Sequence, residues 1–172
     1  MPSKSVLLIV PAVDFNEQEY LTVYGELNKN GFKVFIASDA HTICTGNNGL
    51  KVKNDVSFFN MREANFGAIV FIGGHGVKNY WDNQSLHIIA KKFLASKKIV
   101  AAICSAPVII ARAGILNGIS ASCFPEDKRE IERERALYSD APVTVEKKII
   151  TAQGPSAAKE FVSRIINELN RA

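Results

Sequence analysis

The chain has 172 residues, 47% of them hydrophobic and 22% charged, an ordinary composition for a globular protein that buries a sizeable core. Its net charge is +4, but no arginine-rich arm or basic run with interleaved aromatic residues is present, so the charge alone does not argue for nucleic acid. No apolar stretch approaches the ~18 residues of a membrane span, and the amino-terminal one is too short for a signal peptide. We therefore predict a single cytoplasmic domain over 1–172, with neither a nucleic acid nor a membrane as partner.

The first predicted elements form a βαβ unit. Residues 5–12 are an apolar strand, and the acidic segment 14–20 begins a helix that stops at Asn30 and Gly31. Residues 32–37 are the second strand. A strand, a helix and a strand within about 35 residues predict a parallel sheet with a right-handed crossover.

Strands and helices continue to alternate through the rest of the chain. This pattern predicts an α/β fold, a flavodoxin-like three-layer sandwich with a mostly parallel central sheet. The remaining predicted elements are a hairpin within 42–58, a strand at 67–72, a helix within 79–96, a strand at 99–103, a short helix at 106–113, a strand at 119–122, a charged surface helix at 125–136, strands at 143–146 and 148–152, and a closing helix at 157–169.

Cys104 stands where a buried strand turns sharply into a short helix, the arrangement of a nucleophile elbow, although the G-x-S-x-G pattern is absent. A thiol there faces a helix N-terminus, whose free N–H groups favour the thiolate. The alternative is that Cys104 packs as a small hydrophobic residue, as free cysteines usually do. Its position at the turn favours a reactive thiol.

Two other segments should meet Cys104 at the carboxyl edge of the sheet, where open α/β sheets bind ligands. One is the acidic loop at 14–19, and the other is the run Gly-Gly-His-Gly at 73–76. The backbone N–H groups of Gly74 and Ser105 then form a candidate oxyanion hole beside the sulfur. The glycine-rich run lacks both the P-loop and the dinucleotide patterns, so it is equally consistent with a tight turn.

Three motifs in this order closely resemble the ThiJ/PfpI superfamily, which has a class I glutamine amidotransferase-like fold. They are Glu19 ahead of its helix, Phe-Ile-Gly-Gly at 71–74, and Ala-Ile-Cys-Ser-Ala-Pro at 102–107. The resemblance covers nearly the whole chain and implies a homodimer or higher homo-oligomer with Cys104 as nucleophile. Its relatives include PfpI-type peptidase-like proteins, glyoxalase III or deglycase enzymes, and a redox-sensing branch.

The resemblance also implies a glutamate that hydrogen-bonds the nucleophilic thiol. We assign it to Glu19 rather than Glu17, because Glu19 lies 12 residues before Gly31, as the family glutamate lies before its glycine. A carboxyl group buried beside a thiolate has a raised pKa, stays protonated and can donate to sulfur. Without the resemblance, both residues are interpreted as first-turn carboxylates that stabilise the helix dipole.

The chain departs from the family pattern in its histidines. PfpI-type members carry histidine directly after the nucleophile, where this chain has Ser105, and other branches carry it about 20 residues downstream, where residues 122–125 contain none. His75 is the remaining candidate for a base or a substrate hydrogen bond, or else an exposed loop histidine. His41 and His87 have no comparable setting.

The cysteines indicate a reducing environment. Cys44, Cys104 and Cys123 are an odd number without C-x-x-C or metal-ligand spacing, so we expect neither a disulfide scaffold nor a metal site. Cys123 reads either as an inert core cysteine or as a residue that resolves an oxidised Cys104.

The leading hypothesis is a cysteine enzyme of stress response or detoxification that acts on a small reactive carbonyl, of the glyoxalase III or deglycase type, or that catalyses a related hydrolysis. It needs neither a metal nor an organic cofactor. Cys104 adds to the carbonyl, Gly74 and Ser105 hold the oxyanion, and Glu19 transfers a proton. The second hypothesis is a non-enzymatic redox sensor or stress chaperone that works through oxidation of Cys104. A PfpI-like intracellular peptidase is the weakest, because Ser105 stands where the dyad histidine would be.

Overall fold

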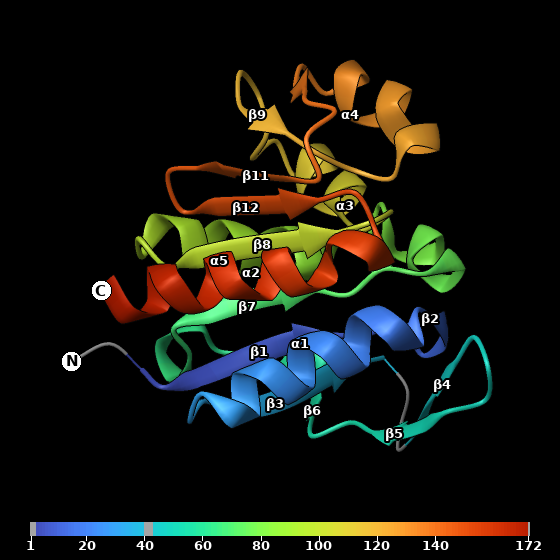
Figure 1. The fold of residues 1–172 in the computed structure, drawn as a ribbon, viewed down its shortest axis with the longest axis vertical. Coiled ribbons are helices and arrows are strands. Elements are labelled where there is room, and N and C mark those ends of the chain that lie inside the picture. Colours follow the sequence, from blue (N-terminus) through green and yellow to red (C-terminus); the bar gives the residue numbers. More distant parts are fainter. Residues whose placement is uncertain (1–2, 40–42, 172) are drawn as a thin grey trace.

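The computed structural model describes residues 3–39 and 43–171. A central sheet lies between two layers of helices (Figure 1). The strands are β1 (Ser5–Ile9), β2 (Val13–Phe15), β3 (Lys33–Ser38), β4 (Ile43–Gly46), β5 (Lys51–Lys53), β6 (Val56–Ser57), β7 (Ala68–Phe71), β8 (Ile99–Ile103), β9 (Ser120–Ala121), β10 (Leu137–Tyr138), β11 (Val143–Glu146) and β12 (Ile149–Ala152). The α-helices are α1 (Glu17–Lys29), α2 (Gln84–Ala95), α3 (Pro107–Arg112), α4 (Lys128–Arg133) and α5 (Ala158–Arg171).

The central sheet has seven strands among the described residues, in the order β11-β12-β8-β7-β1-β3-β6. Every neighbouring pair is parallel except β11 and β12, which form an antiparallel hairpin at one edge. The α/β three-layer fold with a mostly parallel sheet is therefore confirmed. The carboxyl ends of β1, β7 and β8 lie side by side, which brings the loops after these strands together.

The side chains of successive residues in each central strand point to opposite faces of the sheet, so alternate residues pack into two separate hydrophobic cores. Val6 and Leu8 pack with α1 and α5 on one face, which Figure 1 shows in front of the sheet. Leu7 and Ile9 pack with α2 and α3 on the other face. Because β1, β7 and β8 are covered on both faces, their sequences are continuous apolar runs rather than alternating patterns.

Two small sheets lie outside the main one. The β4–β5 hairpin forms as predicted from its glycine-rich turn, and β2 adds to it as a third strand. Strands β9 and β10 form a separate parallel pair. Strands β2, β6 and β10 were not predicted, because they have two or three residues each, too few to show a periodic pattern. Thr42 and His41 lie outside the described residues.

Two predicted helices are shorter in the structure. The helix expected within 79–96 begins at Gln84, because Asn83 caps it by accepting from the N–H of Leu86, and a 3₁₀ helix (His75–Tyr80) precedes it. The charged helix expected at 125–136 is a 3₁₀ turn followed by the six residues of α4. Arg135, two residues after the end of α4, has a positive φ of 64°.

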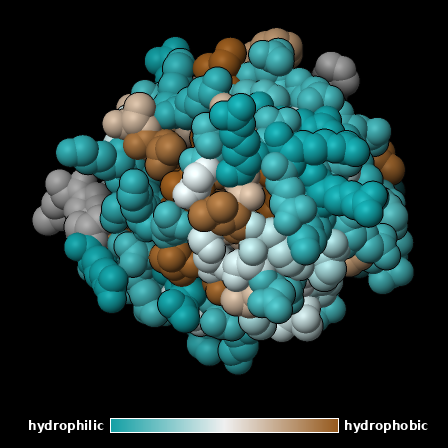
Figure 2. Space-filling view, turned by 90° about the horizontal axis from the view of Figure 1, so that it is seen from above, coloured by the Kyte–Doolittle hydropathy of each residue, from teal (hydrophilic) through white to brown (hydrophobic). Residues whose placement is uncertain are grey.

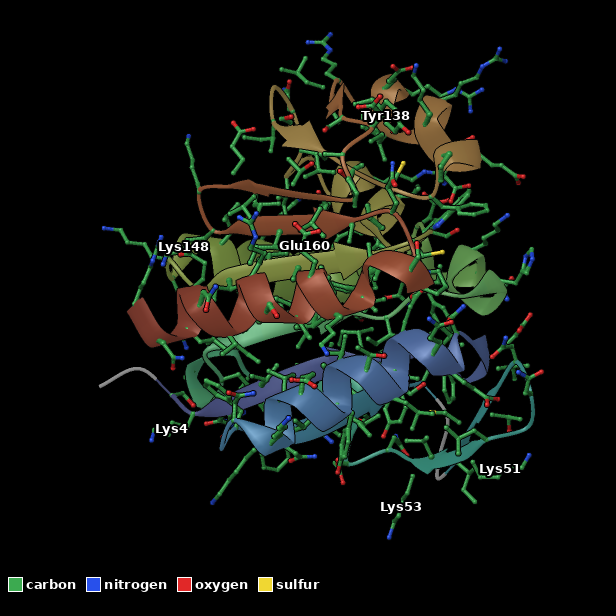
Figure 3. The ribbon with its side chains drawn as sticks, viewed as in Figure 1. Lys4, Lys51, Lys53, Tyr138, Lys148 and Glu160 are labelled. Carbon is green, nitrogen blue, oxygen red and sulfur yellow. The ribbon has the colours of Figure 1, made fainter. Side chains whose placement is uncertain are left out.

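Charged side chains are spread over the surface. Lys4, Lys51 and Lys148 extend from well-separated parts of the molecule (Figure 3). The face seen from above in Figure 2 is mostly hydrophilic, with small separate hydrophobic patches. Within the described ranges, no helix has both the length and the apolar character that a membrane crossing requires. The single domain over 1–172 and the cytoplasmic location stay predictions.

The contact between β2 and the 3₁₀ helix after β7 depends on Gly76. A Cβ at this position would lie 1.7 Å from the carbonyl oxygen of Val13. We expect Gly76→Ala to lower the free energy of unfolding by about 3 kcal/mol, because backbone must move to admit the methyl group. Urea titration checks this, with Gly25→Ala in α1 as the matched control. Gly25 has open space around its Cβ, so alanine there should stabilise the helix by up to about 1 kcal/mol, and equal effects of both changes would contradict the prediction.

Candidate functional site

Cys104 lies between the end of β8 and the start of α3, with a positive φ of 65° that is rare for a residue with a Cβ. Hydrogen bonds hold its backbone on both sides. Its N–H donates to the carbonyl of Ala152 (2.9 Å), and its carbonyl accepts from the N–H of Phe124 (2.7 Å). The expected strand-to-helix elbow is therefore present, and its left-handed backbone is maintained by strand β12 and by the loop after β9.

Glu19 is brought to Cys104 by the start of α1. Asn16 caps this helix by accepting from the N–H of Glu19 (3.0 Å), and the Glu19 side chain then points inward and is completely buried. Its Oε1 accepts from the backbone N–H of Gly73 (2.9 Å). Its Oε2 is buried without a hydrogen bond of ordinary geometry among the described residues. One carboxyl oxygen is therefore available to exchange a proton with the neighbouring thiol.

Glu17 points elsewhere, although it is only two residues away. Its Oε2 accepts from the backbone N–H groups of Asn48 and Leu50 and so holds the turn of the β4–β5 hairpin. The geometry therefore shows which of the two first-turn carboxylates lies next to Cys104. Glu19 is beside the sulfur, and Glu17 anchors a loop.

Gly73 permits the approach of Glu19 to Cys104. A Cβ on residue 73 would lie 2.6 Å from the Cβ of Cys104 and 2.7 Å from Oε1 of Glu19. A side chain there would push the two groups apart. Gly74 was predicted to contribute its N–H, whereas this role of Gly73 was not predicted, although the adjacent glycine pair was the available signal.

The pKa of Glu19 is raised to about 7, chiefly because burial disfavours the carboxylate. The Gly73 N–H and contact with the Cys104 thiol act in the opposite direction and only partly offset the burial. The carboxyl group therefore keeps its proton at a higher pH than an exposed glutamate does. The expected raised pKa of Glu19 agrees with the structure.

The pKa of Cys104 is raised to about 12, which corrects the prediction that the helix N-terminus favours the thiolate. Burial is the largest cause, and the charge of ionised Glu19 is the second. The backbone N–H groups of Ser105 and Gly74 lower the pKa but do not outweigh these effects. The helix behind the elbow has only six residues, so its dipole is weak. The resting state is a thiol next to a carboxyl group that can accept its proton.

The two expected oxyanion donors face the sulfur. The backbone N–H groups of Gly74 and Ser105 and the Ser105 hydroxyl lie close enough to Cys104 to lower its pKa as hydrogen-bond donors. Gly74 has φ of 118°, a conformation that side chains rarely adopt, and a Cβ there would lie 2.5 Å from the backbone nitrogen of Asn16. Glycine is therefore needed for the Gly74 N–H to reach the site.

A cavity of about 210 Å³ opens at Cys104. Its lining residues are Asp14, Asn16, Asn47, Gly74, His75, Lys78, Cys104, Ser105, Phe124 and Pro155. His75 is exposed at its rim, so the structure brings all five predicted site residues together, four at the cavity and Glu19 beneath it. Sequence reasoning missed Phe124 and Asn47, which belong to loops whose path no local pattern predicts.

The other candidate residues lie away from this cavity. His87 is buried on α2 and donates from Nε2 to the carbonyl of Trp81. Cys44 and Cys123 are buried and do not line the cavity, and the Cys123 thiol hydrogen-bonds the carbonyl of Phe124. Across the described ranges, no cluster of three His, Cys, Asp or Glu side chains could hold a metal ion.

Comparison with known proteins gives consistent matches over most of the chain. Residues 4–168 match the model of the DJ-1/PfpI family. An uncharacterised protein of Methanocaldococcus jannaschii is 33% identical over 174 residues, covering 99% of this chain and 85% of the relative. A protein of Pyrococcus horikoshii named as a deglycase is 30% identical over 150 residues, covering 87% of this chain and 90% of the relative.

The crystal structure of a ThiJ/PfpI domain protein from Brachyspira murdochii matches the fold with a TM-score of 0.98 at 30% identity, covering 100% of this chain and 99% of that chain. The match extends over the sheet, its helices and the elbow, so the similarity is not restricted to one motif. On the family model and on this likeness, the resemblance expected from the three motifs is confirmed, and the chain belongs to the DJ-1/PfpI family.

Proposed function

We propose that this protein is a cysteine-dependent enzyme of the glyoxalase or deglycase type that acts on small reactive carbonyls. The observation that carries the proposal is the buried pair of Glu19 and Cys104 beneath a cavity of about 210 Å³, with two backbone N–H groups facing the sulfur. The cavity suits a molecule of a few carbon atoms. The family and the deglycase name of a 30% identical relative support the same class of substrate.

Because the thiol has a high pKa, it needs a general base to accept its proton, and Glu19 takes this role. As the sulfur attacks an aldehyde carbon, the thiol proton passes to the Glu19 carboxylate, whose pKa of about 7 suits a general base near neutral pH. The carbonyl oxygen becomes an oxyanion that accepts from the N–H groups of Gly74 and Ser105. Glu19 then returns the proton to this oxyanion, which gives a hemithioacetal on Cys104 and restores the Glu19 carboxylate.

A 2-oxoaldehyde substrate then needs no external oxidant or reductant. Glu19 removes the proton from the aldehyde carbon, and the resulting enediolate is reprotonated at the neighbouring carbon. The aldehyde carbon is thereby oxidised to a thioester while the ketone is reduced to an alcohol. Water hydrolyses the thioester, which releases a 2-hydroxy acid and restores the thiol. In this proposal His75, at the rim of the cavity, hydrogen-bonds the second carbonyl. The homodimer or higher homo-oligomer implied by the family stays a prediction.

The same geometry supports a redox sensor as the second candidate. Two molecules of hydrogen peroxide would convert the thiol to a sulfinate, releasing two molecules of water. The sulfinate oxygens could accept from Gly74 and Ser105 and from protonated Glu19, whose Oε2 has no ordinary hydrogen-bond partner among the described residues. A peptidase has less support, because His75 is the only histidine among the described residues that line the cavity, and Ser105 occupies the place of a dyad partner.

Cys104→Ser should abolish turnover of methylglyoxal, with a loss of about a thousandfold or more, because the hydroxyl is a far weaker nucleophile. Glu19→Gln should lower kcat by about a hundredfold or more, since the amide cannot accept the thiol proton. Lactate formation measured in a coupled assay checks both. Cys44→Ser, which changes a buried cysteine remote from the cavity, should retain turnover. A wild-type protein inert to 2-oxoaldehydes would contradict the proposed function.

The raised pKa of Glu19 should make stability fall as the pH rises. The unfolded pKa is near 4.5 and the folded pKa near 7, so the folded state binds more protons between these values and loses stability on going from pH 5 to pH 8. The expected loss is on the order of 2 to 3 kcal/mol. Glu19→Gln should remove this component, because an amide keeps the Gly73 contact without titrating. Urea unfolding at both pH values measures it, and identical pH dependence in the two proteins would show that Glu19 titrates normally.

Mild peroxide treatment tests the second candidate. If the site functions as a sensor, mass spectrometry should find two added oxygens selectively on Cys104, with Cys44 and Cys123 unchanged. Uniform oxidation of all three cysteines would argue against a sensor.

A further inference from the structure

The carbonyl of Ser105 is held by a side chain that lies outside the cavity. The indole Nε1–H of Trp81 donates to this carbonyl at 2.9 Å. Ser105 is 3% exposed, so its carbonyl would otherwise be buried away from water. Trp81 is not among the residues that line the cavity around Cys104. It therefore contacts the oxyanion residue without being placed to touch a substrate.

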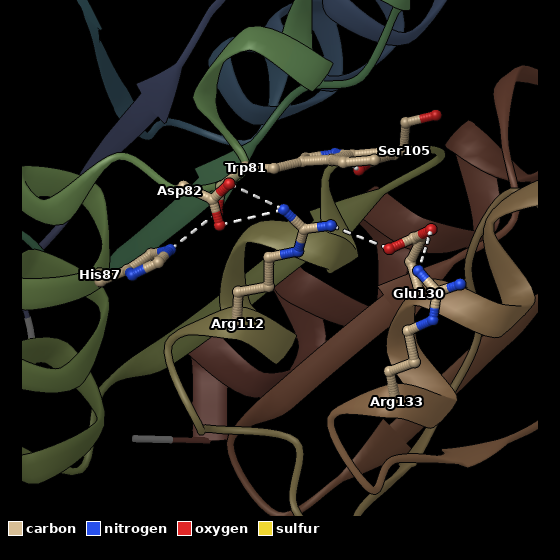
Figure 4. Close-up of polar contacts among 7 residues, drawn as sticks. All are labelled: Trp81, Asp82, His87, Ser105, Arg112, Glu130 and Arg133. Carbon is tan, nitrogen blue, oxygen red and sulfur yellow. Dashed lines mark hydrogen bonds and ion pairs between the residues drawn. The ribbon is translucent and has the colours of Figure 1, made fainter.

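Arg112 at the end of α3 holds the ring of Trp81. Its guanidinium carbon lies 5.0 Å from the centroid of the indole, a cation–π contact (Figure 4). Its Nη1 bonds both carboxylate oxygens of Asp82 (3.0 and 2.9 Å), and its Nη2 bonds Glu130 of α4 (2.8 Å). Two carboxylates on different elements thus fix the planar group in one orientation, an arrangement that suits arginine and not lysine.

The backbone of Trp81 is fixed as well. Its carbonyl accepts from Nε2 of His87 at 2.8 Å, which ties residue 81 to helix α2 (Figure 4). The indole is consequently restrained at both its ring and its main chain. These contacts link α2, α3 and α4 to a single atom of the elbow, the carbonyl oxygen of Ser105.

We propose that Trp81, held in place by Arg112, is a positioning residue that fixes the backbone of Ser105 so that its N–H points at the reacting sulfur. The carbonyl and the N–H of Ser105 belong to successive peptide groups, so fixing the first limits rotation of the second. Cys104 before it already has a left-handed backbone, and such a turn needs restraint from outside. The catalytic consequence rests on the proposed function, whereas the geometric consequence for the thiol does not.

Thiol alkylation tests the geometry without any substrate. The Ser105 N–H lowers the pKa of Cys104, so its displacement should raise that pKa and slow the reaction with iodoacetamide at pH 8. We expect Trp81→Phe, which keeps a ring but removes the indole N–H, to slow alkylation of Cys104 by about threefold or more, the effect of half a pKa unit. Peptide mass spectrometry reports each cysteine separately.

Arg112→Met provides a second variant, with Lys128→Met as its matched control. Both substitutions remove a cation that lies 5.0 Å from an aromatic centroid, but Lys128 stacks on Tyr138, away from Ser105. Arg112→Met should slow alkylation in the same direction as Trp81→Phe, Arg112→Lys should have a smaller effect, and Lys128→Met should have none. In turnover of a 2-oxoaldehyde, the Trp81 and Arg112 variants should lower kcat about tenfold with little change in KM, because the oxyanion forms only after binding.

Unchanged alkylation of Cys104 in both Trp81→Phe and Arg112→Met would overturn the proposal. Faster labelling of Cys44, Cys104 and Cys123 together would also overturn it, since that outcome shows general loosening of the fold. If wild-type protein turns over no carbonyl while both variants still slow alkylation, the proposed function fails and the positioning role stands. If turnover is normal in both variants, the positioning role fails and the proposed function stands.

Discussion

The contact between Glu19 and Cys104 is the constraint on which the rest of the site depends. Burial raises the pKa of Glu19 to about 7, and burial together with the charge of ionised Glu19 raises the pKa of Cys104 to about 12, so the sulfur keeps its proton near neutral pH. The contact is possible because residue 73 has no Cβ. A parallel sheet then places the loop after β7 beside the elbow after β8, with the start of α1 over both.

Much of the fold could be predicted from the sequence, because parallel strands covered on both faces leave apolar runs that differ plainly from the amphipathic helices between them. The elbow followed from one such run ending at Cys104. What escaped prediction was either very short, as with β2 and β6, or depended on contacts between distant segments. The start of α2 at Gln84 was misjudged because a 3₁₀ helix of six residues precedes it, and six residues are too few for a sequence pattern to distinguish a period of 3.0 from one of 3.6.

For the candidate site, too, some features were predictable from the sequence and others were not. The residue types were predictable, since a cysteine at a strand-to-helix turn and a glycine pair after the next strand point to one edge of the sheet. The state of the thiol was not. A helix N-terminus favours a thiolate in isolation, but burial and a nearby carboxylate act more strongly, and both depend on how Glu19 packs in three dimensions. Likewise, the hydrogen bond from Trp81 to Ser105 joins residues 24 positions apart and leaves no periodic signal.

Trp81 is the single tryptophan in the sequence. Its indole N–H reaches the elbow and its ring lies against a guanidinium group, so its emission spectrum depends on the electric field at the site. Intrinsic fluorescence of the unmodified protein is therefore a local optical reporter, free of background from other indoles. Ligand entry or covalent modification of the sulfur can be followed with it in real time, without an attached dye.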